Sequence, residues 1–136
     1  MKAEKTANRD LYYTTDHEWI NFQGTIAYIG VCHFKLSGFK GIDQITYKAT
    51  SGLRKAGETI ATLTYHDFEI VVAMPVDGKI LETNPTLIYS EPDYLIKHAE
   101  TNGWIARIVP SQPYERKGLL LPKQYQMNGK SKFSKQ

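Results

Sequence analysis

A succession of short β-type segments, each followed by turn residues, is the feature that most limits how this chain can fold. Residues 44–50 show it best, because Ile45, Tyr47 and Ala49 alternate with polar residues and so fall on one face of a strand. Further strands are expected at residues 25–31, 59–65, 69–74, 79–82 and 104–109. Short strands at this spacing, with Gly, Pro and Asn between them, predict a mainly β sandwich or barrel.

Turns and short helices complete this expectation. Asp77-Gly78 has the composition of a two-residue hairpin turn, so we expect the strands on either side of it to pair. Short helices are expected at residues 32–40 and 93–100. Gly38 weakens the first of these helices by about 1 kcal/mol relative to alanine.

Length and composition fit a single domain with an ordinary core, since 41% of the 136 residues are hydrophobic. No apolar run approaches the roughly 18 residues that a membrane helix needs. The opening residues, Met1 to Lys5, lack the apolar stretch of a signal peptide. We therefore expect a cytoplasmic protein with no membrane partner. The single cysteine, Cys32, excludes an internal disulfide and fits a reducing compartment.

The net charge of +3 is concentrated near the C-terminus, where residues 111–136 hold six Lys or Arg residues and one Glu. Such a segment suits a nucleic-acid or acidic partner. Its Gly, Ser, Gln and Lys content favours a solvated, partly disordered end instead, and we expect no nucleic-acid partner. Leu119 to Leu121 are expected to pack back on the domain, and docking to a partner or a second copy is the alternative. We thus expect a flexible N-terminus at residues 1–11, a folded domain at residues 12–110 and a basic extension at residues 111–136.

Several segments are similar, in the same order, to motifs of one known family. The opening YTTDHEWI at residues 13–20 is similar to that family's YTxxHEWV, and AMPVDG at residues 73–78 is similar to its SPVSG. GWIARI at residues 103–108 resembles the closing GWLxKI. Weaker similarities are found at residues 29–31, 53–58 and 84–92. From Tyr12 to Pro110 the chain thus resembles the glycine cleavage system H protein family.

This resemblance implies a lipoyl-type barrel-sandwich hybrid, which consists of two small twisted sheets with one or two short helices and, here, a C-terminal extension. The family's protein is not itself an enzyme. It carries lipoate on a lysine at a hairpin tip and moves an aminomethyl group between the glycine cleavage enzymes, which are its partners. A long arm is needed because the group must reach several active sites.

The lysine that the family modifies precedes the proline of SPVSG by eight positions, and counting back from Pro75 gives Asp67. A shift in register does not supply a lysine, because none occurs between Lys55 and Lys79. Asp67 has no amine and cannot form the lipoyl amide. The resemblance and this residue together predict carrier architecture without bound lipoate, so no cofactor-binding residue is expected.

The hypothesis that follows is a non-lipoylated H-like protein that acts as a binding or accessory protein for a protein partner. Its partner-facing element would be the hairpin tip, which we define as Tyr65, His66, Asp67 and Phe68. The alternative is a true lipoyl carrier that is modified at Lys55 or Lys79, although neither lysine matches the required hairpin position.

Other reactive residues are more simply explained by structural roles. His66, Asp67 and Glu69 suggest a metal site or an acid–base pair, but neighbours in a strand point to opposite faces. We therefore expect no metal site and no catalytic residue. Cys32 follows a strand, and a small buried thiol is a simpler role for it than a nucleophile.

His17, Glu18 and Trp19 match the family's HEW. In a functional carrier this region lies near the place where the loaded arm docks. For Trp19 a core position is the simpler interpretation, with its neighbours holding the opening strand in place.

Overall fold

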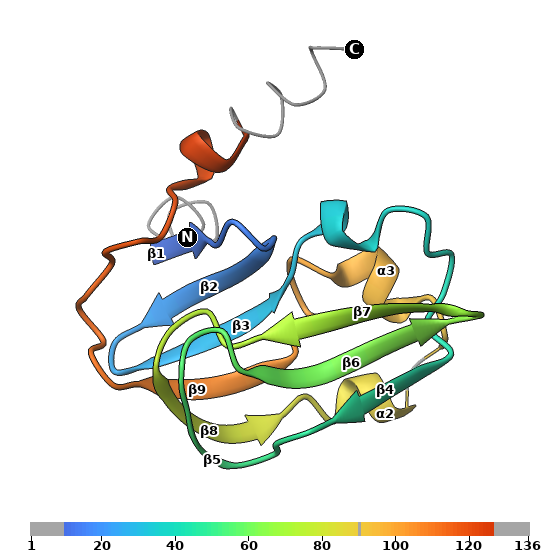
Figure 1. Cartoon of the computed structure of the whole chain (residues 1–136), viewed down its shortest axis with the longest axis horizontal. Helices are drawn as coiled ribbons and strands as arrows, with labels where there is room; N and C mark the ends of the chain where they lie inside the picture. The colour runs from blue at the N-terminus through green and yellow to red at the C-terminus, as the bar shows by residue number, and fades with distance from the viewer. Residues whose placement is uncertain (1–9, 90, 127–136) are drawn as a thin grey trace, which may run out of the picture.

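The computed structural model describes residues 10–89 and 91–126, which form two antiparallel β-sheets and short helical segments (Figure 1). The larger sheet has the strand order β1-β2-β3-β9-β8-β5. Its strands are β1 Asp10–Tyr13, β2 Glu18–Gln23, β3 Ile26–Val31, β5 Gly52–Arg54, β8 Gly78–Thr83 and β9 Ala106–Pro110. The smaller sheet has the order β4-β6-β7. Its strands are β4 Gln44–Tyr47, β6 Thr59–Tyr65 and β7 Phe68–Ala73.

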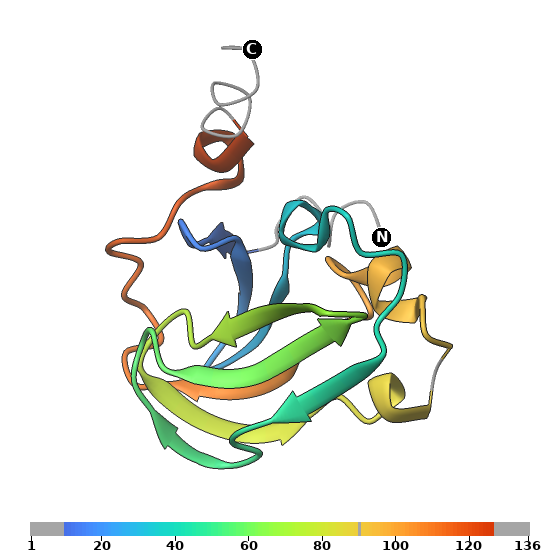
Figure 2. The ribbon, with the colours of Figure 1, turned by 45° about the vertical axis from the view of Figure 1, so that its right-hand side comes forward.

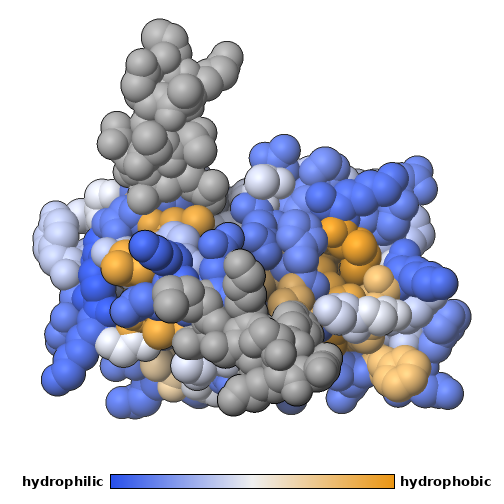
Figure 3. All heavy atoms as spheres, turned by 90° about the horizontal axis from the view of Figure 1, so that it is seen from above, coloured by the Kyte–Doolittle hydropathy of each residue, from blue (hydrophilic) through white to orange (hydrophobic). Residues whose placement is uncertain are grey.

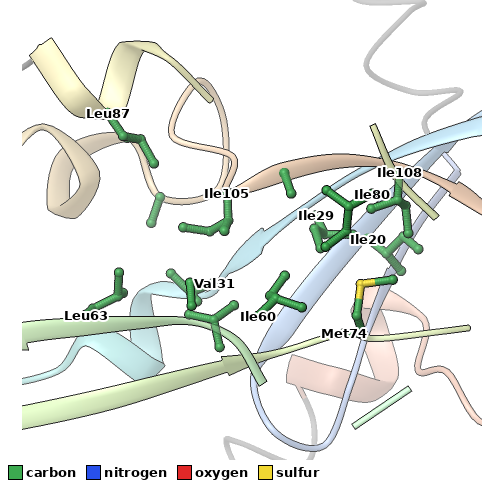
Figure 4. Packing of buried hydrophobic residues seen from close by; sticks show 14 of the residues in the cluster. Ile20, Ile29, Val31, Ile60, Leu63, Met74, Ile80, Leu87, Ile105 and Ile108 are labelled. Carbon is green, nitrogen blue, oxygen red and sulfur yellow. The ribbon is translucent and has the colours of Figure 1, made fainter. Parts of the chain in front are cut away.

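The hydrophobic core lies between the two sheets, whose inner faces turn apolar side chains toward each other (Figure 4). The larger sheet contributes Ile20, Ile29, Ile80 and Ile108, and the smaller sheet contributes Ile60 and Leu63. Full burial of each such side chain stabilises the fold by about 1.5–3 kcal/mol. This architecture confirms the mainly β class that the strand pattern predicted and the two sheets that the family resemblance implied.

The helical segments are shorter than the sequence suggested. The segment expected at residues 32–40 is a 3₁₀ helix, η1, limited to His33–Leu36. It ends there because Ser37 has a ψ of 130°, which lies outside the helical region, and Gly38 then follows with a φ of 91°. The helix expected at residues 93–100 is α3, Tyr94–His98, and a further short helix, α2, spans Thr86–Tyr89.

Asp77-Gly78 does not form the expected hairpin turn. The strands on either side of it, β7 and β8, belong to different sheets and do not pair. Gly78 is needed here for close packing, because a Cβ at this position would lie 2.8 Å from the carbonyl oxygen of Val109 in β9. The prediction was therefore wrong, since the chain crosses between sheets at a point where local composition favours a tight reversal.

Both terminal segments are attached to the domain over their described parts. Strand β1 begins at Asp10, inside the segment expected to be flexible, while residues 1–9 lie outside the described residues. Leu120 forms a backbone bridge with Tyr13, and Leu119 packs against the core, so the expected packing is confirmed for these two leucines. It was wrong for Leu121, which is 49% exposed. Arg116 binds the carboxylate of Asp10 at 2.5 Å. Residues 127–136, where a disordered end was expected, also lie outside the described residues.

The surface seen from above Figure 1 is mostly hydrophilic, and the hydrophobic areas visible between the hydrophilic residues are small and separate (Figure 3). Exposed apolar side chains are instead found singly on several elements. Those of Leu53, Phe68, Tyr89 and Tyr114 are the most exposed among the described residues. Single exposed apolar residues are normal for a soluble domain, so exposure alone does not select a binding surface.

Candidate functional site

The hairpin tip joins β6 to β7, and the antiparallel register fixes its geometry. Tyr65 pairs with Phe68, so His66 and Asp67 form a two-residue turn. His66 has a φ of 57°, and a positive φ at the first turn residue is a feature of the primed turns that suit hairpins. This conformation costs an L-residue about 1–2 kcal/mol. The backbone N–H of His66 donates to the Asp43 carboxylate at 2.6 Å, which stabilises the turn.

The four hairpin-tip residues are not equally exposed. His66 and Asp67 are exposed, and Phe68 has 67% of its surface accessible. Tyr65 is half-buried, with its ring centroid 5.4 Å from that of Phe39 and 4.1 Å from that of His66. The tip thus presents an imidazole, a carboxylate and a phenyl ring to solvent. Tyr65 connects the tip to the rest of the domain through its contact with Phe39.

The titratable residues of the hairpin lie in the turn and on the strand beside it. Within residues 10–89 and 91–126, no group of three or more His, Cys, Asp and Glu side chains is placed to hold a metal ion. His66 and Asp67 occupy the turn itself, while Glu69 lies exposed on β7.

A second candidate region surrounds Glu18, a buried carboxylate that links the two sheets. Only 2% of Glu18 is exposed, and its carboxylate accepts bonds from Lys35 Nζ at 2.7 Å and from the Ala73 backbone N–H at 3.0 Å. The Thr14 hydroxyl donates to the other carboxylate oxygen at 3.0 Å. A buried charge needs such partners to offset its desolvation. We call this arrangement of Thr14, Glu18, Lys35 and Ala73 the Glu18 anchor.

An open groove lies beside the Glu18 anchor. It has a volume of about 470 Å³, and its walls include Asp16 on one side and Glu69 and Val71 of β7 on the other. Because β7 is an edge strand, the groove follows the open edge of the smaller sheet. At the Ala73 end of β7, the backbone N–H of this edge donates to the Glu18 carboxylate.

Trp19 and His17, the neighbours of Glu18, have structural contacts. Trp19 is buried, and its indole N–H donates to the Ala99 carbonyl at 2.9 Å. A Cβ on Gly30 would lie 2.6 Å from the Trp19 ring, so glycine is required beneath it. The core position expected for Trp19 is therefore confirmed. His17 Nδ1 lies 2.7 Å from the hydroxyl of Tyr125 in the C-terminal segment.

Cys32 is a buried thiol, as the simpler interpretation of the sequence predicted. Burial raises its pKa to about 12, although a hydrogen bond with Tyr125 acts in the opposite direction. The thiol is therefore protonated at neutral pH, which does not favour nucleophilic chemistry. Burial also raises the pKa of Tyr125. Tyr125 was not singled out from the sequence, because no local pattern connects it with Cys32 or His17.

The two lysines that flank the hairpin in the sequence lie in different settings. Lys55 is exposed and follows β5, in a turn closed by a hydrogen bond from the Glu58 backbone N–H to the Lys55 carbonyl at 3.0 Å. Lys79 lies within β8, where it pairs with Leu53 and Val109. Neither lysine is part of the hairpin tip.

Comparison with known proteins identifies the chain's relatives. A family model described as "Glycine cleavage H-protein" matches residues 11–132. The chain belongs to the glycine cleavage H-protein family. Because the match extends to residue 132, the segment after Pro110 lies inside the family's region, and the boundary expected at Pro110 is not the end of the similarity.

Individual H proteins are similar to the chain over most of their length. The glycine cleavage system H protein of Alkaliphilus oremlandii is 30% identical over 115 residues, which cover 85% of this chain and 89% of that protein. The H protein of Bacteroides thetaiotaomicron is 29% identical over 112 residues, with 82% and 88% covered. A crystal structure of an H protein from Mycobacterium marinum has a TM-score of 0.73 and 23% identity, and covers 88% of this chain and 97% of its own. This structure supports the shared fold.

The described residues contain no helix that is both long and apolar enough to cross a membrane.

Proposed function

We propose that this H-like protein acts by binding a protein partner and carries no lipoyl group. The observation that carries the proposal is Asp67, which lies in the exposed two-residue turn of the β6–β7 hairpin. By resemblance this position belongs to the lysine that receives lipoate. A carboxylate cannot replace the amine in that amide bond. No lysine occurs between Lys55 and Lys79 that could receive the lipoyl group instead.

The placement of the flanking lysines supports the same proposal. Lys79 is held in the larger sheet and presents no hairpin tip to a modifying enzyme. Lys55 is exposed in a turn, so it is the residue on which the alternative, a carrier modified at another lysine, depends.

In this proposal the hairpin tip recognises the partner through His66, Asp67 and Phe68. Phe68 supplies apolar area, and aromatic side chains often contribute strongly to binding in protein interfaces. The glycine cleavage enzymes are the first partners to test, because the family works with them. The protein is a cytoplasmic binding or accessory protein in this proposal, not an enzyme.

Lipoylation is tested by co-expressing the full chain with a lipoate ligase and measuring its intact mass. The wild type is expected to gain no lipoyl mass. An Asp67→Lys variant provides the matched gain-of-function control, because it restores an amine at the exposed turn, and peptide mapping would locate any lipoyl group. Lipoyl mass on the wild type, with loss of that mass in Lys55→Arg or Lys79→Arg, would establish the alternative carrier instead.

The binding role is tested with purified glycine cleavage enzymes by calorimetric titration of the wild type and of Phe68→Ser. Binding by the wild type that weakens at least ten-fold in Phe68→Ser, equivalent to about 1.4 kcal/mol, is the expected result. Leu53→Ser is the matched control, since Leu53 is similarly exposed but lies on β5 in the other sheet. Equal affinity of the three proteins would exclude the hairpin tip as the contact.

A further inference from the structure

A cavity of about 400 Å³ lies beside β4, an edge strand of the smaller sheet, and shares no lining residue with the groove beside Glu18. Strand β4 and helix α2 are side by side in both ribbon views, and they form opposite walls of this cavity together with the start of α3 (Figure 1 and Figure 2). Ile42, Leu87 and Leu95 line it and are buried, so its floor is apolar. Cavities of this size and lining suit small organic ligands.

The walls of the cavity are held in place by specific hydrogen bonds. The Ile42 N–H donates to the Pro92 carbonyl at 2.8 Å, which joins the segment before β4 to the segment before α3. Asn84, which is buried, accepts from the Thr86 N–H at 3.0 Å and donates to the Trp104 carbonyl at 2.9 Å. These contacts fix α2 relative to the larger sheet, so the cavity is a built feature of the fold.

Two carboxylates, those of Asp43 and Glu91, stand at the exposed rim of the cavity. Among the residues that the structure describes, those that line the cavity include no Lys, Arg or His. The ion pairs found within residues 10–89 and 91–126 involve neither carboxylate. One oxygen of Asp43 accepts from the His66 N–H. An apolar floor below a rim of one charge sign is complementary to a ligand with an apolar body and a positive end.

We propose that this cavity binds a small aliphatic amine, with its alkyl chain on the apolar floor and its ammonium group at the rim with Asp43 and Glu91. Ammonium donors form charge-assisted hydrogen bonds with carboxylates. An anionic ligand would meet like charge at the rim. The carboxylates lie at the rim and the apolar residues lie at the floor. A partner's lysine side chain would enter with its charged end first and place its ammonium group on the apolar floor, so it fits this arrangement less well.

The proposal goes beyond the proposed function and does not depend on it, because it concerns residues outside the hairpin tip. Asp43 nevertheless connects the two regions through its bond to the His66 N–H. An ammonium group bound at Asp43 therefore changes the surroundings of the His66 amide, which serves as a second reporter of binding.

The test is a titration of the ¹⁵N-labelled full chain with n-pentylammonium at low salt, followed by amide chemical shifts. Saturable shifts are expected at Asp43, Leu95 and His66. Uncharged 1-pentanol is expected to bind more weakly. Asp43→Asn and Glu91→Gln should each weaken pentylammonium binding about two- to five-fold, the range of an exposed ion pair. Asp16→Asn, an exposed carboxylate variant in the other groove, should leave the affinity unchanged.

Four outcomes overturn the proposal. They are equal affinity for 1-pentanol, absence of saturable shifts, unchanged affinity in both rim variants, and tighter binding of Nα-acetyl-lysine amide than of pentylammonium. The last outcome would assign the cavity to a partner's lysine. Glu91→Gln keeps the test decisive if Asp43→Asn disturbs the turn, because the Glu91 side chain makes no hydrogen bond within the described residues.

Discussion

The two ends of strand β7 are held in opposite ways. At its first residue, Phe68 is exposed and Asp67 stands in the turn beside it. At its last residue, the Ala73 N–H binds the buried carboxylate of Glu18, which also pairs with Lys35. Both ends feature an acidic residue, but only Glu18 has lost its water and depends on protein partners. Replacing the exposed carboxylate of Asp67 is therefore expected to change folding stability little, whereas removing a partner of the buried Glu18 carboxylate is expected to destabilise the fold.

The largest expected effect comes from breaking the Glu18 anchor. Lys35→Ala leaves the buried Glu18 carboxylate without its cation, so unfolding free energy should fall by about 3 kcal/mol. Urea denaturation measures this loss. Lys79→Ala is the control, because Lys79 is exposed and forms none of the ion pairs of the described residues, and its change should stay within about 0.5 kcal/mol. Similar values for the two variants would contradict the contrast between anchor and surface.

The folding stability of the protein should fall at alkaline pH because of the buried thiol of Cys32. Burial raises the pKa of Cys32 from 9.0 to about 12 in the folded state. Between these values the unfolded chain releases the thiol proton while the folded chain keeps it, so stability falls as pH rises through this window. The Cys32 contribution lost between about pH 8 and about pH 10.5 is about 2 kcal/mol, at 1.36 kcal/mol for each pKa unit.

Cys32→Ala removes that contribution. Tyr47, whose pKa burial raises to about 12, titrates in the same window in both proteins. The pKa of Tyr125 is raised by burial and by its hydrogen bond with Cys32, so the difference between the two pH profiles is assigned to Cys32 together with its contact with Tyr125. Denaturant unfolding across this pH range should show a shallower decline in Cys32→Ala than in the wild type. Parallel profiles would contradict the expectation that burial keeps the Cys32 thiol protonated in the folded protein.

The smallest effect is expected at the hairpin tip and has the opposite sign. His66→Gly removes the cost of a positive φ and should stabilise the protein by about 0.5–1 kcal/mol, after allowing for the greater freedom of glycine in the unfolded chain. Asp67→Gly is the matched control, because Asp67 has no positive φ, and it should be neutral or destabilising. Thermal unfolding compares the two, and equal effects would show that the turn stores no strain at His66.

Much of the fold could be predicted because strands and turns leave local patterns. The alternation around Ile45 and Tyr47 and the register between Tyr65 and Phe68 both follow from a period of two residues. Asp77-Gly78 shows the limit of such reasoning. Its composition favours a hairpin, but the chain crosses between sheets there, since packing against β9 overrides the local preference.

The candidate functional residues also include some that could be placed from the sequence and others that could not. Asp67 at the tip was placed from the sequence, because a hairpin joins residues that are close along the chain. The partners of Glu18 were not, since Ala73 lies 55 positions away and Lys35 lies 17 positions away. Tyr125 is 108 positions from His17, and the cavity rim brings Asp43 near a segment that follows α2.

By itself, the sequence determined the β-rich class, the family resemblance and the absence of a lysine between Lys55 and Lys79. These properties depend on residue identity and short-range pattern alone. Only the tertiary structure decided which carboxylates are buried and paired and which remain exposed. Burial and pairing arise when distant strands pack together, and the energy of a charge depends on those neighbours and on the water they exclude.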